Sequence, residues 1–93
     1  MLRLDYEALA IESNKLKAEG DTFEECINTM TNIISALPDI WEAETCDQYL
    51  VQYDAAKPTL MEVRQLIQDM ALQMDSISRN FAQADSDMRS QMQ

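Results

Sequence analysis

Few side chains in this chain of 93 residues are suited to chemistry. Histidine is absent, so the commonest general base and zinc ligand is missing. Cys26 and Cys46 are the two cysteines, and two thiolates alone do not complete a structural zinc site. Asp85 and Asp87 lack the spacing and the glycine of a calcium-binding loop. We therefore expect no enzyme, with no catalytic residue, no cofactor and no metal.

The charge of the chain excludes a second class of function. Seventeen acidic residues against seven basic ones give a net charge of −10, whereas nucleic-acid binding requires a basic surface.

The sequence has no apolar run long enough to span a membrane, and its first residues contain no apolar core of a signal peptide. We expect synthesis in the cytoplasm without a cleaved signal peptide, which leaves export by another route open.

The elements that position these side chains are indicated by a regular apolar repeat. Apolar residues recur at alternating steps of three and four, which is typical of a helix that packs lengthwise on another helix. Ser13 and Gly20 interrupt the repeat in the first half, and their small size would let a neighbouring helix come close. The expected packing seam consists of Leu9, Leu16, Phe23, Ile27, Met30, Ile34, Tyr53, Leu60, Ile67, Met70, Met74 and Ile77.

One segment, Leu37-Pro38-Asp39, carries a strong turn signal, because proline disfavours helical angles in the residue before it. Asp39 is suited to cap the helix that follows. The sequence thus predicts an all-α antiparallel hairpin. It forms a single domain over residues 1–93, with a helix over about 5–37, a turn at 38–40, a second helix over about 40–85 and a frayed tail at 86–93.

Gly20 and Pro58 are the two places where these helices could break. The apolar repeat stays in phase across both, so we expect a locally weak but continuous first helix and a kink in the second.

A hairpin of this kind leaves apolar surface without a partner. A bend at residue 39 would place residue 5 opposite residue 73, so that Met74, Ile77, Phe81, Ala84 and Met88 overhang. Leaving large apolar side chains in water forfeits about 1.5–3 kcal/mol each. We therefore expect dimerisation into a four-helix bundle, with a second copy or with a related helical hairpin.

Two motifs follow one another in a fixed order, Trp41-Glu42-Ala43 at the bend and Phe81-Ala82-Gln83-Ala84-Asp85 near the end. In this order and spacing the chain resembles the WXG-motif family, small helical-hairpin substrates of Gram-positive type VII secretion systems. Ala43 stands where the family has glycine. Phe81 stands where the family's export signal, Tyr-x-x-x-Asp/Glu, has tyrosine. The resemblance extends over nearly the whole chain.

The resemblance implies a secreted, dimeric protein whose Trp41 shapes the turn and whose Phe81 and Asp85 are read by a type VII secretion ATPase. Such proteins are associated with virulence or interbacterial competition. The tail also resembles that of helical targeting partners of LXG-domain toxins, which is the alternative function. The repeat alone leaves a third alternative, a cytosolic coiled-coil structural subunit.

Overall fold

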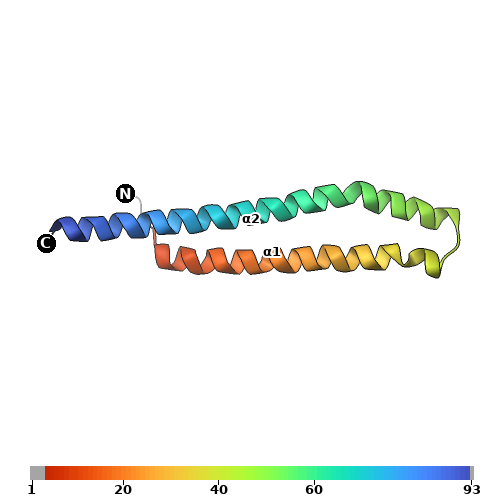
Figure 1. Cartoon of the computed structure of the whole chain (residues 1–93), viewed down its shortest axis with the longest axis horizontal. Helices are drawn as coiled ribbons and strands as arrows, with labels where there is room; N and C mark the ends of the chain where they lie inside the picture. Colours follow the sequence, from red (N-terminus) through yellow and green to blue (C-terminus); the bar gives the residue numbers. More distant parts are fainter. Residues whose placement is uncertain (1–3, 93) are drawn as a thin grey trace.

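The structure, a computed structural model that describes residues 4–92, consists of two long antiparallel helices (Figure 1). Helix α1 spans Tyr6–Ser35, a short 3-10 turn η1 spans Leu37–Asp39, and helix α2 spans Glu44–Met92. Helix α1 begins, and helix α2 ends, at the same end of the rod (Figure 1). The expectation of an all-α hairpin is confirmed.

Helix α1 is continuous and has a defined start. The Asp5 carboxylate accepts a hydrogen bond of 3.0 Å from the Ala8 amide, which satisfies one of the free donors of the first turn. The helix passes through Gly20 without a break. Thr22 does not cap a second segment there, because its hydroxyl donates to the Ala18 carbonyl one turn back at 3.1 Å.

The connection between the helices is longer than the sequence suggests. The amides of Ile40 and Trp41 both donate to the Leu37 carbonyl, at 3.0 and 2.9 Å, so that Asp39 is part of the 3-10 turn and does not cap α2. The first helical bonds of α2 are accepted by the Ala43 carbonyl instead. Helix α2 therefore begins at Glu44, four residues after the expected position.

Helix α2 is 49 residues long and continues through Pro58. Figure 1 shows that it changes direction in its green-to-teal part, around residues 50–60, as a proline inside a helix requires. At its other end the helix runs to Met92, whereas the expected second helix ended at about residue 85.

The late start of α2 fixes the register of the hairpin. The Ser13 hydroxyl donates to the Ala71 carbonyl at 2.9 Å, and the Ser78 hydroxyl donates to the Tyr6 carbonyl at 2.6 Å. Both pairs are centred on residue 42, not on residue 39. The expected overhang therefore starts too early in the sequence: α1 reaches Ser78, so Met74 and Ile77 do not overhang, and the blue end of α2 projects past α1 (Figure 1).

The hairpin is too thin to enclose a core of its own. Its extents are 76 × 17 × 17 Å and its radius of gyration is 21.4 Å, against roughly 12 Å for a compact domain of this length. Ile27, Cys46 and Ala71 are the fully buried apolar residues of the described part of the chain. Most apolar side chains are therefore half-buried or exposed in a single copy.

Candidate functional site

The buried line between the helices is made of small and medium-sized residues. In α1, Ser13, Gly20 and Ile27 are seven residues apart and all buried. A Cβ atom on Gly20 would lie 3.0 Å from Arg64 Nη1 and 3.1 Å from Ile67 Cγ2, so side chains of α2 lie close against α1 where the side chain is missing. The small residues in the apolar repeat do bring the helices together.

A hydroxyl cluster closes this line near the turn. The Tyr53 hydroxyl lies 2.6 Å from Thr31 Oγ1 and 3.2 Å from the Ile27 carbonyl. Thr31 Oγ1 in turn donates to the same carbonyl at 2.8 Å. The polar end of a half-buried aromatic side chain is thus satisfied inside the interface.

The structure divides the expected packing seam into a buried and an exposed part. Ile27 is buried, whereas Met30, Met70 and Ile77 are exposed by 36%, 48% and 45%. The remaining members are half-buried between these extremes: Leu9, Leu16, Phe23, Ile34, Tyr53, Leu60, Ile67 and Met74. One periodic stripe in the sequence therefore serves two surfaces, the contact between α1 and α2 and a flank of the hairpin.

We name that flank the free face. A shallow hollow lined by Phe23, Cys26 and Ile67 lies on it, and Val63 and Met70 are the helical neighbours of Ile67 on this side, away from Arg64. Because residues seven apart stay in line on packed helices, the free face comprises Leu9, Leu16, Phe23 and Met30 of α1 with Val63, Met70 and Ile77 of α2. Phe81, one helical turn after Ile77, extends it toward the tail.

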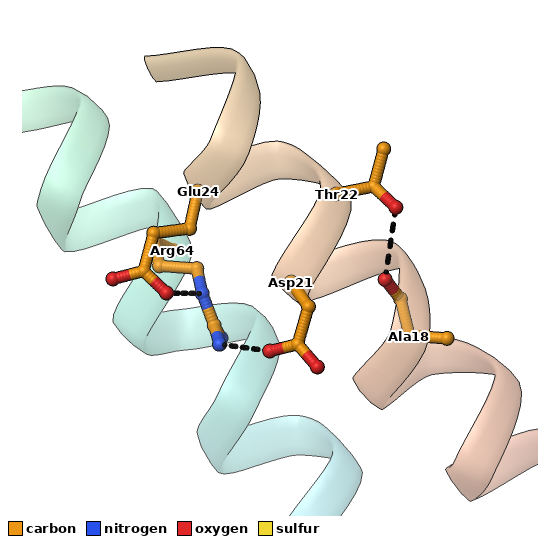
Figure 2. A network of polar contacts seen from close by, with 5 residues as sticks. All are labelled: Ala18, Asp21, Thr22, Glu24 and Arg64. Atoms are coloured by element: carbon orange, nitrogen blue, oxygen red, sulfur yellow. Dashed lines mark hydrogen bonds and ion pairs between the residues drawn. The ribbon is translucent and has the colours of Figure 1, made fainter. Parts of the chain in front are cut away.

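The opposite flank is polar and ion-paired. Arg64 reaches across from α2 and donates to Asp21 at 2.9 Å, with its Nε 3.6 Å from Glu24 (Figure 2). Its side chain is only 13% exposed, and Nε is the one buried side-chain nitrogen or oxygen in the described residues without a hydrogen bond. Further along the same flank, Lys17 lies 3.9 Å from Asp75.

The turn motif lies at the far end of the rod from both termini. Trp41 is half-buried, and its ring packs on Tyr49, with 5.5 Å between the ring centroids and a tilt of 54°. Glu42 and Ala43 are exposed, and Ala43 occupies the N-cap position of α2. The motif therefore shapes the entrance to α2, with an aromatic pair beside it.

The tail motif lies next to the start of α1. Phe81 is 41% exposed, and the Asp85 side chain is 40% exposed. The Tyr6 hydroxyl donates to Asp85 Oδ2 at 3.2 Å, and Arg89 Nη2 lies 2.8 Å from the same oxygen. The Asp85 carboxylate raises the pKa of Tyr6, first through this hydrogen bond and then through its charge. Both Tyr6 and Asp85 line a hollow that also includes Arg89.

Tyr6 and Arg64 are functional candidates that the sequence reading did not identify. A signal for both was present, because Tyr6 precedes Ser13 by seven residues, and Arg64 precedes Ala71 by seven. Arg64 is charged, and the residue seven positions after Tyr6 is a serine, so neither continues an apolar repeat.

Comparison with known proteins adds the family. The family described as proteins of 100 residues with WXG, WXG100, matches residues 1–86. The chain belongs to the WXG100 family. This confirms the resemblance noted in the sequence, and it places the chain among small, secreted helical proteins that are not enzymes.

Two curated relatives of this WXG100 protein agree with the family over almost their whole length. An ESAT-6-like protein, SAG1039, of Streptococcus agalactiae serotype V is 25% identical over 91 residues, which cover 98% of this chain and 95% of the relative. The protein YukE of Bacillus subtilis is 23% identical over 92 residues, covering 99% and 95%. The WXG100 chain thus has the length of its relatives.

Two kinds of feature, a membrane-spanning helix and a metal-ligand cluster, are absent from the described residues. Within residues 4–92, neither α1 nor α2 has a stretch long and apolar enough to cross a membrane. In the same part of the chain, no three cysteines or acids come close enough together to hold a metal ion.

Proposed function

We propose that this WXG100 chain is exported by a Gram-positive type VII secretion system as a dimer of helical hairpins, and that Phe81 and Asp85 form the export signal read by the secretion ATPase. The free face is the observation that carries the proposal. Its α2 side chains Val63, Met70, Ile77 and Phe81 are exposed by 40–48%, on a protein with almost no buried core.

A second helical hairpin is the partner that fits this face. The free face is narrow, follows both helices and repeats every seven residues, which is the pattern that another helix pair matches. Covering a large apolar side chain completely contributes about 1.5–3 kcal/mol, so half-exposed side chains gain about half of that each. The domain, residues 1–93, would then complete its core by association, with a second copy or a related hairpin.

The tail is a suitable signal because it combines exposure with order. Phe81 and Asp85 are one helical turn apart, so an aromatic ring and a carboxylate lie side by side on α2. A groove with an apolar pocket and a basic rim would bind both. The protein would be made in the cytoplasm and leave by the type VII route without losing a signal peptide.

Export of single variants from the native bacterial host tests the signal. We expect Phe81→Ala and Asp85→Ala to remain in the cell fraction on quantitative immunoblots. Their melting temperatures should stay near that of the wild type, since Phe81 is 41% and the Asp85 side chain 40% exposed and both lie outside the buried line. Leu72→Ala and Asp87→Ala are the matched controls, being exposed residues of α2. Normal secretion of both tail variants would overturn the proposed signal.

The second candidate function is that of a targeting partner of an LXG-domain toxin. It is favoured by one observation, the absence of a hydroxyl on residue 81. Light scattering after size-exclusion chromatography separates the two functions. A particle of twice the 10.7 kDa chain mass supports the homodimer, whereas a monomer that captures an LXG domain from the same host supports the alternative.

A further inference from the structure

The two ends of the chain meet beside the tail motif. Tyr6 is the first residue of α1 and Asp85 lies near the end of α2, and their side chains are joined by a hydrogen bond of 3.2 Å across 79 residues of sequence. The backbone of Tyr6 is held as well, since its carbonyl accepts the Ser78 hydroxyl at 2.6 Å. Tyr6 is thus held against α2 through its backbone carbonyl as well as through its hydroxyl group.

The contacts on Asp85 are confined to one of its oxygens. Tyr6 Oη and Arg89 Nη2 both contact Oδ2, at 3.2 and 2.8 Å. Among the side-chain contacts within residues 4–92, none is made to Oδ1, which retains its capacity to accept hydrogen bonds. The side chain remains 40% exposed. One oxygen therefore fixes the carboxylate, and the other stays available for an outside donor.

We infer that Tyr6 is a positioning residue of the tail signal, and that the recognised surface is composed of both ends of the closed hairpin. This inference rests on the proposed function of Phe81 and Asp85. The hydroxyl of Tyr6 holds the carboxylate in one orientation beside the Phe81 ring. A receptor with an apolar pocket and a cationic or hydrogen-bonding group beside it then meets a preorganised pair, which saves the cost of ordering an exposed side chain.

The charges around the phenol are consistent with this role. Asp85 raises the pKa of Tyr6, Glu7 raises it slightly, and Arg89 acts in the opposite direction. The phenol therefore stays protonated, and remains a donor, throughout the physiological pH range.

Three variants test the inference in the export assay of the native host. Tyr6→Phe removes a single oxygen and should lower the secreted amount about fivefold or more, the effect of losing a hydrogen bond to a charged group. Ser78→Ala removes only the hydroxyl that holds the Tyr6 carbonyl and leaves both partners of the Tyr6–Asp85 hydrogen bond in place, so it should lower export less than Tyr6→Phe does. Tyr49→Phe, which removes the hydroxyl of a half-exposed tyrosine at the far end of the rod, should also export normally.

The outcomes separate this inference from the proposed function. Normal or increased export of Tyr6→Phe, while Asp85→Ala is retained, would overturn the positioning role and leave the tail signal standing. Equal losses in Tyr6→Phe and Ser78→Ala would also overturn it, because they would reflect a merely loosened helix end. Normal export of Asp85→Ala would remove the signal itself. Circular dichroism of each purified variant verifies that it is folded.

Discussion

Gly20 and Arg64 show how a single pair sets the distance between the helices. A glycine inside a helix costs about 1 kcal/mol relative to alanine, and here it leaves room for the guanidinium of Arg64 and for Ile67. The guanidinium then spans to Asp21 and Glu24 on the other helix. The absence of a side chain at Gly20 and the ion pairs of Arg64 are thus parts of one contact between the helices, and this contact identifies the register of the hairpin.

We expect Gly20→Leu to destabilise the protein by about 1–3 kcal/mol, the usual effect of overpacking a close contact. The new side chain has no space between Arg64 and Ile67. Urea unfolding followed by circular dichroism measures the effect. Ala18→Leu, at an exposed position of the same helix, should change stability little, and equal stability of the two variants would contradict the packing described for Gly20.

The Tyr6–Asp85 contact predicts a specific titration. The pKa of Tyr6 is raised by Asp85, so the hydrogen bond supports the hairpin below the ordinary tyrosine pKa of 10.0 and is lost as the pH rises through the raised value. In NMR spectra with ring-labelled tyrosine, Tyr6 should titrate above 10.0, and Asp85→Asn should bring its pKa back toward the ordinary value. An unchanged titration in Asp85→Asn would show that the contact is absent in solution.

At the scale of the elements, the number of helices, their pairing and the apolar repeat could be predicted from the sequence. The division of the repeat into a buried line and a free face could not, because Ser13, Arg64 and Ser78 occupy the buried line and carry no apolar signal. The start of α2 could not be predicted either. Aspartate is a favourable N-cap residue, but Asp39 belongs to the 3-10 turn and α2 begins later. Centring the bend on residue 39 instead of residue 42 made the expected overhang start at Met74, although α1 reaches Ser78.

The start of α2 has a weak cap, which predicts a stabilising substitution. Alanine at the N-cap offers no side-chain acceptor to the free amides of the first turn. We expect Ala43→Ser to stabilise the protein by about 0.5–1 kcal/mol, and Ala43→Gly by a similar or slightly smaller amount. Thermal unfolding should show a rise of several degrees, since 1 kcal/mol corresponds to about 4–8 °C at this size. Ala55→Ser, at an exposed interior position of the same helix, is the control, and a rise there instead would contradict the assignment of the cap.

At the scale of the whole molecule, the net charge opposes the association of two copies, whereas the exposed apolar surface favours it. Two copies that each carry −10 repel, so the proposed homodimer would depend on apolar contacts such as those of the free face. Two positions of α2 are matched for a test of this. Met70 is 48% exposed on the free face, and Leu72 is 49% exposed beside Arg64 on the polar flank.

We expect Met70→Glu to convert the dimer to a monomer in light scattering, while Leu72→Glu leaves it intact. Both substitutions add the same charge to the same helix, so the difference isolates the position. Loss of the dimer in both variants, or in neither, would place the contact elsewhere.

The repulsion also predicts a dependence on salt. Raising the ionic strength from about 0.01 to 0.15 M shortens the Debye length from about 30 to 8 Å and screens the like charges of two copies. The homodimer should therefore tighten with salt in sedimentation equilibrium. Weakening with salt would contradict this expectation, because it would indicate that ion pairs between the two copies contribute to holding them together.

The buried line between the helices changes character along its length, and this bears on how the rod comes apart. Near the turn it contains Ile27, Cys46 and the ring of Tyr53, whereas toward the termini it contains Ser13, Ala71 and Ser78. Apolar burial is thus concentrated at one end, and the other end is joined largely by hydroxyl groups. Deuterium should enter the backbone amides fastest at the terminal end, with protection rising toward the turn. We therefore expect the hairpin to open first at the end that carries Tyr6 and Asp85, before global unfolding, so that local opening there would determine how often the two residues are in contact.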